Sequence, residues 1–302
     1  MSAGRGVPDR SAEVEPVGVV GLGVVGATVR DAFEEAGVPT RGYDPYLGSG
    51  SAEDLAPCGV SFLCVGTPGA PGGGHDLSQV WSAMAEMGHH LRPEAIVAVK
   101  STVPPGTADR LAAAHSRIIF VSAPEFMVAA DPRDTFRHPD RIVVGARARR
   151  DAEAVARLLS IVAPEAPIAF LSPTEAELVK LCANAMLAAK VTMANELSEI
   201  CVRFGVDWSR VRGVVGQDPR IGLEHTEVTP ERGFGGACLP KDLDGLISVS
   251  GAAGYPPAVL EAIAEFNRRV REDAEASRDG QPVPLRRPIH PGRATRASEG
   301  SR

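Results

Sequence analysis

Residues 233–242 form the segment best suited to covalent chemistry. It carries one thiol, Cys238, which follows three glycines and precedes Lys241 and Asp242. A nearby cation favours the thiolate, which is the nucleophilic form of a cysteine. Glycines let a ligand lie close to the backbone, so we expect the substrate to contact the first part of the segment, at Phe234, Gly235 and Gly236. The alternative is a loop around an inert, buried cysteine.

Lys180 and Asn184 form a second candidate site. They are four residues apart, so in a helix they share one face. Their neighbours on that face are apolar, and a lysine on the buried side of a helix needs a partner or a function. The pattern therefore predicts a polar site inside a helical domain, with two ordinary helix-surface residues as the alternative.

Three glycines near the start of the chain, Gly21, Gly23 and Gly26, have the spacing of a pyrophosphate-binding turn. They follow a short β-branched run and precede an amphipathic segment, as the strand, turn and helix of a dinucleotide fold require. Asp44 lies at the end of the next expected strand, 40–43, where a carboxylate accepts hydrogen bonds from ribose hydroxyls and repels a 2′-phosphate. This favours NAD over NADP. A glycine-rich turn that binds no dinucleotide is the alternative.

The turn belongs to an alternating pattern of apolar runs and helical or loop segments. Such short, continuous runs are typical of buried parallel strands. We therefore predict an α/β domain over residues 17–168, a Rossmann-type doubly wound parallel sheet. Its expected strands are 17–20, 40–43, 60–65, 96–99, 118–121 and 142–144.

A long helix should follow this domain. Ser172 and Glu175 have the spacing of a capping box, and Pro173 takes the first helical position. No glycine or proline occurs from Thr174 to Phe204. About 30 residues give a helix of roughly 45 Å, longer than one domain needs. We predict a mostly helical domain over 169–275 that forms a homodimer through this helix. Its apolar side chains are hard to cover from one side only: Leu178, Leu181, Leu187, Met193 and Leu197.

Composition limits the class of protein. The formal net charge is −6, and an acidic chain argues against general nucleic-acid binding. No apolar run is long enough for a membrane span. Five cysteines without a C-x-x-C pair argue against a disulfide framework or a zinc site and favour a reducing cytoplasm. We expect residues 1–16 to be a disordered leader and 276–302 a disordered tail.

Taken together, the motifs resemble one family from Val17 to about Arg269. The segments 64–68, 100–107, 123–126, 180–184, 218–222 and 235–242 occur in the order and with the residues of the UDP-glucose/GDP-mannose dehydrogenases. The resemblance implies an NAD-dependent oxidoreductase that oxidises a primary alcohol of a nucleotide sugar, or of a nucleoside-like substrate, twice.

The same resemblance implies roles for single residues. Cys238 would attack the intermediate aldehyde and carry a thioester that water hydrolyses, and Lys180 and Asn184 would stabilise the oxyanion. The remaining roles are water-holding or proton relay by Asp242 and Thr102, hydrolysis by Glu125, and cofactor contact by Thr67 and Lys241. No metal is expected.

The chain also departs from the family. Members carry a further α/β domain that binds the substrate's nucleotide, and nothing resembling it follows the last expected helix, from Pro257 to about Asp273. The family's Arg-Glu pair after Phe126 is replaced by apolar residues. Two alternatives therefore stay open. One is a β-hydroxyacid-type dehydrogenase with a single oxidation, against which Cys238 argues. The other is a non-catalytic subunit completed by a partner chain, which the set of Cys, Lys, Asn and Asp opposes.

Overall fold

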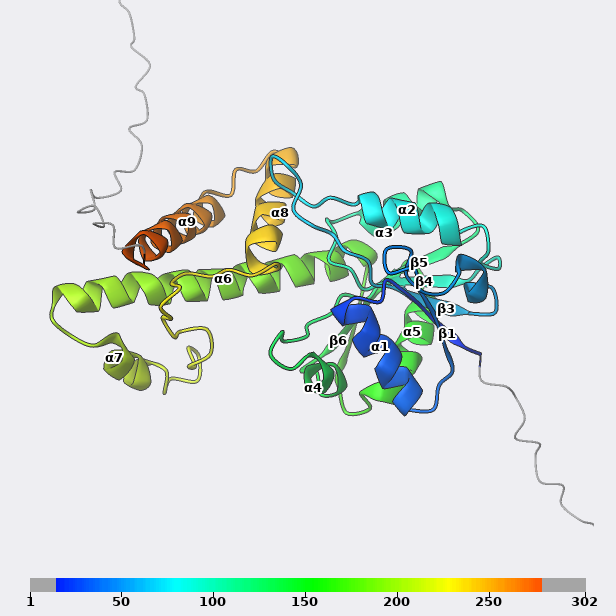
Figure 1. Ribbon diagram of the computed structural model, residues 1–302, viewed down its shortest axis with the longest axis horizontal. Coiled ribbons are helices and arrows are strands. Elements are labelled where there is room, and N and C mark those ends of the chain that lie inside the picture. Colours follow the sequence, from blue (N-terminus) through cyan, green and yellow to red (C-terminus); the bar gives the residue numbers. More distant parts are fainter. Residues whose placement is uncertain (1–14, 279–302) are drawn as a thin grey trace, which may run out of the picture.

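The computed structural model describes residues 15–278 (Figure 1). The predicted disordered leader and tail lie largely outside these residues, and two described parts differ from the prediction. Glu15 forms an ion pair with Arg92, 2.7 Å apart. The last helix runs to Arg278, so the first residues of the predicted tail are helical.

One seven-stranded sheet with the order β2-β1-β3-β4-β5-β6-β7 organises the first part of the chain. The first five strands pair in parallel, with Val20 opposite both Tyr43 and Leu63. This confirms the Rossmann-type prediction. The strands are β1 (Val17–Val20), β2 (Thr40–Tyr43), β3 (Val60–Leu63), β4 (Ile96–Val99), β5 (Ile119–Ser122), β6 (Ile142–Gly145) and β7 (Ile168–Leu171).

The last two strands correct the prediction of an all-parallel sheet. β6 pairs with β5 in the antiparallel sense, through Ser122 and Gly145, and β7 runs parallel to β6. A strand covered on both faces is apolar whichever way it runs, so the sequence carried no signal for its direction. β7 is half-buried at the edge of the sheet and was not predicted. It carries the sheet to Leu171, past the predicted boundary at residue 168.

Helices cover both faces of the sheet, as a doubly wound fold requires. On one face the core joins Val29 and Phe33 to Val155, and on the other it joins Leu63 to Met84 and Leu111. The two layers are visible in Figure 1. The helices are α1 (Val24–Glu35), α2 (Ser78–Met87), α3 (Thr107–Ala114), α4 (Pro132–Arg137) and α5 (Arg149–Val162), with a 3₁₀ turn, η1 (Ala52–Leu55).

The predicted long helix is α6 (Pro173–Arg203), which has 31 residues and begins with the expected capping box of Ser172 and Glu175. Its first turns belong to the Rossmann part, because the buried carboxylate of Glu177 accepts hydrogen bonds from backbone N–H groups at the start of α3. Its middle packs against the other helices, so α6 connects both parts of the molecule (Figure 1). These helices are α7 (Trp208–Val215), α8 (Leu239–Ala252) and α9 (Ala258–Arg278).

The apolar side chains of α6 divide into two sets. Leu181 is fully buried and lies in one cluster with Leu243 of α8, so this chain covers it. Met193 is 59% exposed, so this chain does not cover it.

Within residues 15–278, no helix is both long and apolar enough to cross a membrane. The same residues contain no group of three or more metal-binding side chains.

Candidate active site

The glycine turn between β1 and α1 has the geometry of a phosphate cradle. Gly21 has φ +83°, which favours glycine, and a Cβ on Gly26 would come within 1.7 Å of the Gly21 carbonyl oxygen. These two glycines therefore serve the turn itself. A Cβ on Gly23 would meet no protein atom within 4 Å. Gly23 thus leaves open space at the start of α1, which no side chain caps, and this fits a pyrophosphate at a helix N-terminus.

Asp44 lies beside this turn and is largely committed to backbone groups. Its Oδ2 accepts from the Leu22 N–H at 2.6 Å, and its Oδ1 accepts from the N–H groups of Tyr46 and Leu47 at 2.9 and 3.1 Å. A carboxylate offers about four acceptor positions. One position therefore remains on Oδ2, next to the open end of α1, for a further donor such as a ribose hydroxyl.

Asp242, in the first turn of α8, is the centre of a buried polar cluster. The Asn184 Nδ2 donates to its Oδ2 at 2.5 Å, while Lys241 Nζ and His75 Nε2 lie 2.7 and 3.0 Å from its Oδ1. Burial raises the pKa of Asp242, but the His75 bond, the Lys241 charge and the Asn184 bond together hold it below its ordinary value. Asp242 is therefore an ionised carboxylate at neutral pH.

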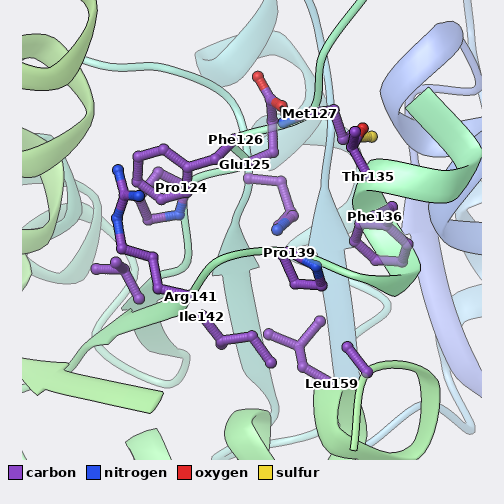
Figure 2. Close-up of a pocket in the computed structure, with 13 residues that line it drawn as sticks. Pro124, Glu125, Phe126, Met127, Thr135, Phe136, Pro139, Arg141, Ile142 and Leu159 are labelled. Atoms are coloured by element: carbon purple, nitrogen blue, oxygen red, sulfur yellow. Dashed lines mark hydrogen bonds between the residues drawn. The ribbon is translucent and has the colours of Figure 1, made fainter. Parts of the chain in front are cut away.

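Lys180 lies one turn before Asn184 and forms a second buried pair. Its Nζ is 3.3 Å from Glu125 Oε1 and 5.3 Å from the centre of the Phe126 ring, which also carries the Arg141 guanidinium at 4.4 Å. Figure 2 shows Arg141 beside that ring. The cavity next to Glu125 is only about 30 Å³, room for about one water molecule. It is too small for a sugar.

A short chain of polar contacts joins the remaining predicted residues to Asp242. Lys241 Nζ lies 3.4 Å from Thr67 Oγ1, which donates to the Thr102 carbonyl oxygen at 2.8 Å. Thr102 thus enters the network through its backbone. Lys241 belongs to α8 and Thr67 to the Rossmann part. Their contact therefore joins α8 to the cofactor domain.

Cys238 is exposed and immediately precedes α8, where its carbonyl oxygen accepts the Asp242 N–H at 2.9 Å. The preceding glycine loop borders a cavity of about 480 Å³, to which Gly235 and Gly236 contribute. Phe234 borders it too, but only 5% of this residue is exposed and it belongs to the helical core. The Arg271 side chain lies against Gly235, where a Cβ would come within 2.8 Å of it, whereas a Cβ on Gly236 would meet no protein atom within 4 Å. The loop therefore offers a ligand its backbone at Gly236, beside a cavity that α9 lines with charged side chains such as Arg268 and Glu272.

Two further residues, which no sequence pattern marks, hold this site together. His75 binds Asp242 from a loop of the Rossmann part. Asn267 of α9 binds the Phe234 backbone on both sides: its Oδ1 accepts the N–H at 2.6 Å and its Nδ2 donates to the carbonyl oxygen at 2.9 Å. A single histidine after a glycine run, or one asparagine among charged helix residues, forms no recognisable spacing pattern.

The fold and the glycine turn define a dinucleotide-binding protein whose Rossmann part is followed by a helical part with a buried polar cluster. Residues 48–162 match the NAD binding domain of the UDP-glucose/GDP-mannose dehydrogenase family, and residues 174–269 match its central domain. A UDP-glucose dehydrogenase structure from Pyrobaculum islandicum superposes with a TM-score of 0.79 at 32% identity, over 91% of this chain and 73% of that one. The chain belongs to this family.

Two other comparisons qualify that assignment. UDP-glucose 6-dehydrogenase of Pseudomonas aeruginosa is 35% identical over 232 residues, which are 73% of this chain and 51% of the relative. The chain thus spans about half the length of the curated relatives it matches. A 3-hydroxyisobutyrate dehydrogenase of Mycobacterium tuberculosis shares the fold, with a TM-score of 0.68, 17% identity and coverage of 86% of this chain and 95% of that one.

Proposed function

We propose that the protein is an NAD-dependent dehydrogenase that oxidises the primary alcohol of a nucleotide sugar to the acid. The observation that carries this proposal is the buried hydrogen bond from Asn184 to an ionised Asp242, in the first turn of the helix that Cys238 precedes. One turn before Asn184 on α6, Lys180 is paired with Glu125. The family relationship and relatives named for UDP-glucose support the substrate class. The test is NADH formation by the purified protein across nucleotide sugars, nucleosides and free sugars.

In this proposal each residue has one task. NAD, when bound, would accept one hydride, so the two oxidations would use two NAD molecules in turn. Lys180 and Asn184 donate to the oxygen on which negative charge develops. Cys238 forms a C–S bond to the aldehyde carbon while the thiol proton passes to the aldehyde oxygen, and loss of a hydride and of that proton in the second oxidation leaves a thioester. Glu125 takes a proton from the water that attacks the thioester carbon, the C–S bond breaks, and the proton passes to the leaving sulfur, so that the acid and the free thiol are released.

A single-step dehydrogenase is the second candidate, because the Mycobacterium tuberculosis enzyme shares the fold over nearly its full length. That reaction yields one NADH for each substrate molecule and does not need Cys238. A non-catalytic subunit yields none. Counting NADH for each substrate molecule consumed therefore separates the three hypotheses in one assay.

The protein should bind NAD more tightly than NADP. The Asp44 carboxylate lies with one free acceptor position beside the open start of α1, so a ribose 2′-hydroxyl can donate to it. A 2′-phosphate would face its negative charge at close range. Calorimetric titration of both cofactors into the same protein checks this. Equal affinities, or tighter NADP binding, would refute it.

We further propose a homodimer that uses the outer face of α6. Exposed apolar side chains lie along α6, directly after it and on α7: Met186 (72%), Met193 (59%), Phe204 (80%) and Val214 (69%). Large exposed apolar patches mark interfaces. Light scattering at micromolar protein should give twice the chain mass, and Met186→Glu with Met193→Glu should give one chain mass. A monomeric parent protein would refute the proposal.

A further inference from the structure

His75 belongs to the glycine-rich loop between β3 and α2, and its side chain is fully buried against α8. A Cβ on Gly245 of α8 would come within 2.0 Å of the imidazole ring, so the ring fits because residue 245 has no side chain. The loop is folded on itself through a bridge between Gly69 and His75. Figure 1 shows it reaching from the Rossmann part to α8. A loop of the cofactor domain thus ends on the helix that carries Asp242.

The protonation of His75 follows from its surroundings. Asp242 is ionised, and an ionised carboxylate only accepts hydrogen bonds, so Nε2 carries the hydrogen in the 3.0 Å contact. Nδ1 is buried and has no hydrogen-bond partner among the described residues. A second proton on Nδ1 would create a buried N–H without an acceptor and a buried positive charge. The neutral Nε2–H form avoids both.

We propose that His75 is a positioning residue, a neutral Nε2–H donor that fixes the Asp242 carboxylate and attaches the cofactor domain to α8. His75 and Lys241 both reach Oδ1 of Asp242. Lys241 also lies 3.4 Å from Thr67, so its ammonium group is shared between Asp242 and Thr67. His75 has no competing acceptor at Nε2. Asn184 holds Oδ2 from the other side and leaves one acceptor position there for a water or a substrate hydroxyl. What Asp242 does with that position rests on the proposed function.

The kinetic test uses His75→Gln, His75→Ala and a control, Asp76→Asn, with UDP-glucose and NAD as substrates. Gln carries an amide nitrogen close to the position of Nε2 and keeps the donor, whereas Ala removes it. We expect kcat to fall about 10- to 100-fold in the Ala variant, the effect of losing one hydrogen bond to a charged group, with the KM for NAD nearly unchanged. The Gln variant should stay within about threefold of the parent.

The control changes the next residue, whose carboxylate caps α2 through the Ser78 N–H and should leave kcat at the parent value. An Ala variant as fast as the parent would overturn the proposal. So would a Gln variant as slow as Ala, because then the volume of the ring matters and its donor does not.

A second measurement does not depend on turnover. ¹⁵N NMR of the imidazole groups, with the His75 signals assigned from the His75→Gln spectrum, should show a protonated Nε2 and a bare Nδ1. A hydrogen on Nδ1, alone or together with Nε2, would overturn the proposal. A parent protein that makes no NADH from any sugar would instead sink the proposed function, and the nitrogen spectrum would still decide whether His75 holds Asp242.

Discussion

Replacing Cys238 by Ala should lower acid formation by about 10³-fold or more, because the variant cannot form the C–S bond on which the second oxidation depends. In the proposed route the first oxidation does not need the thiol. Cys238→Ser should reach the aldehyde level and then stall, since an oxygen nucleophile forms an ester adduct that turns over poorly. Quantifying aldehyde and acid products by mass spectrometry distinguishes these outcomes.

Cys182→Ala is the matched control for this experiment. Its thiol is exposed like that of Cys238, but it lies on α6, outside the polar cluster. This variant should form acid at the rate of the parent protein. If Cys238→Ala also forms acid at that rate, the covalent route is wrong, and the hypothesis of a single-step dehydrogenase replaces it.

Removing the charge of Lys180 should lower kcat by about 10²- to 10³-fold, the usual effect of losing one oxyanion donor. The donor acts on charge that develops during the reaction, so the KM of the sugar should change much less. Lys180→Met is the more informative variant, because it keeps the apolar stem beside the Phe126 ring. Steady-state kinetics with saturating NAD give kcat and KM separately.

Lys180 also forms an ion pair with Glu125, 3.3 Å away, so the variant must be shown to fold. Its thermal unfolding midpoint should be recorded with that of Lys190→Ala, a change at a half-buried lysine further along the same helix. A folded Lys180→Met protein with the parent kcat would contradict the assigned role.

The sequence predicted those parts of the fold that are encoded locally. The glycine turn, the strand before it and the capping box at Ser172 each depend on neighbouring residues, and the structure has them at these positions. The direction of β6 and the existence of β7 depend on pairing across the sheet. A short apolar run in a covered sheet looks the same in either direction.

The same distinction between local and long-range information applies to the candidate site. Lys180 and Asn184 could be paired from the sequence because a helix brings residues four apart onto one face. That Asn184 contacts Asp242 depends on how α8 packs on α6, and the family resemblance, not spacing, suggested that both belong to one site. His75 lies 167 positions from Asp242 and could only be found in three dimensions.

A four-electron oxidation through a thioester on Cys238 leaves two signatures, one in the cofactor and one on the protein. The number of NADH molecules formed for each sugar consumed is recorded together with the mass of the intact protein. We expect two NADH and, in a variant with slowed hydrolysis such as Glu125→Gln, a sugar adduct that accumulates on Cys238. One NADH, no adduct and unchanged turnover in Cys238→Ala would contradict it.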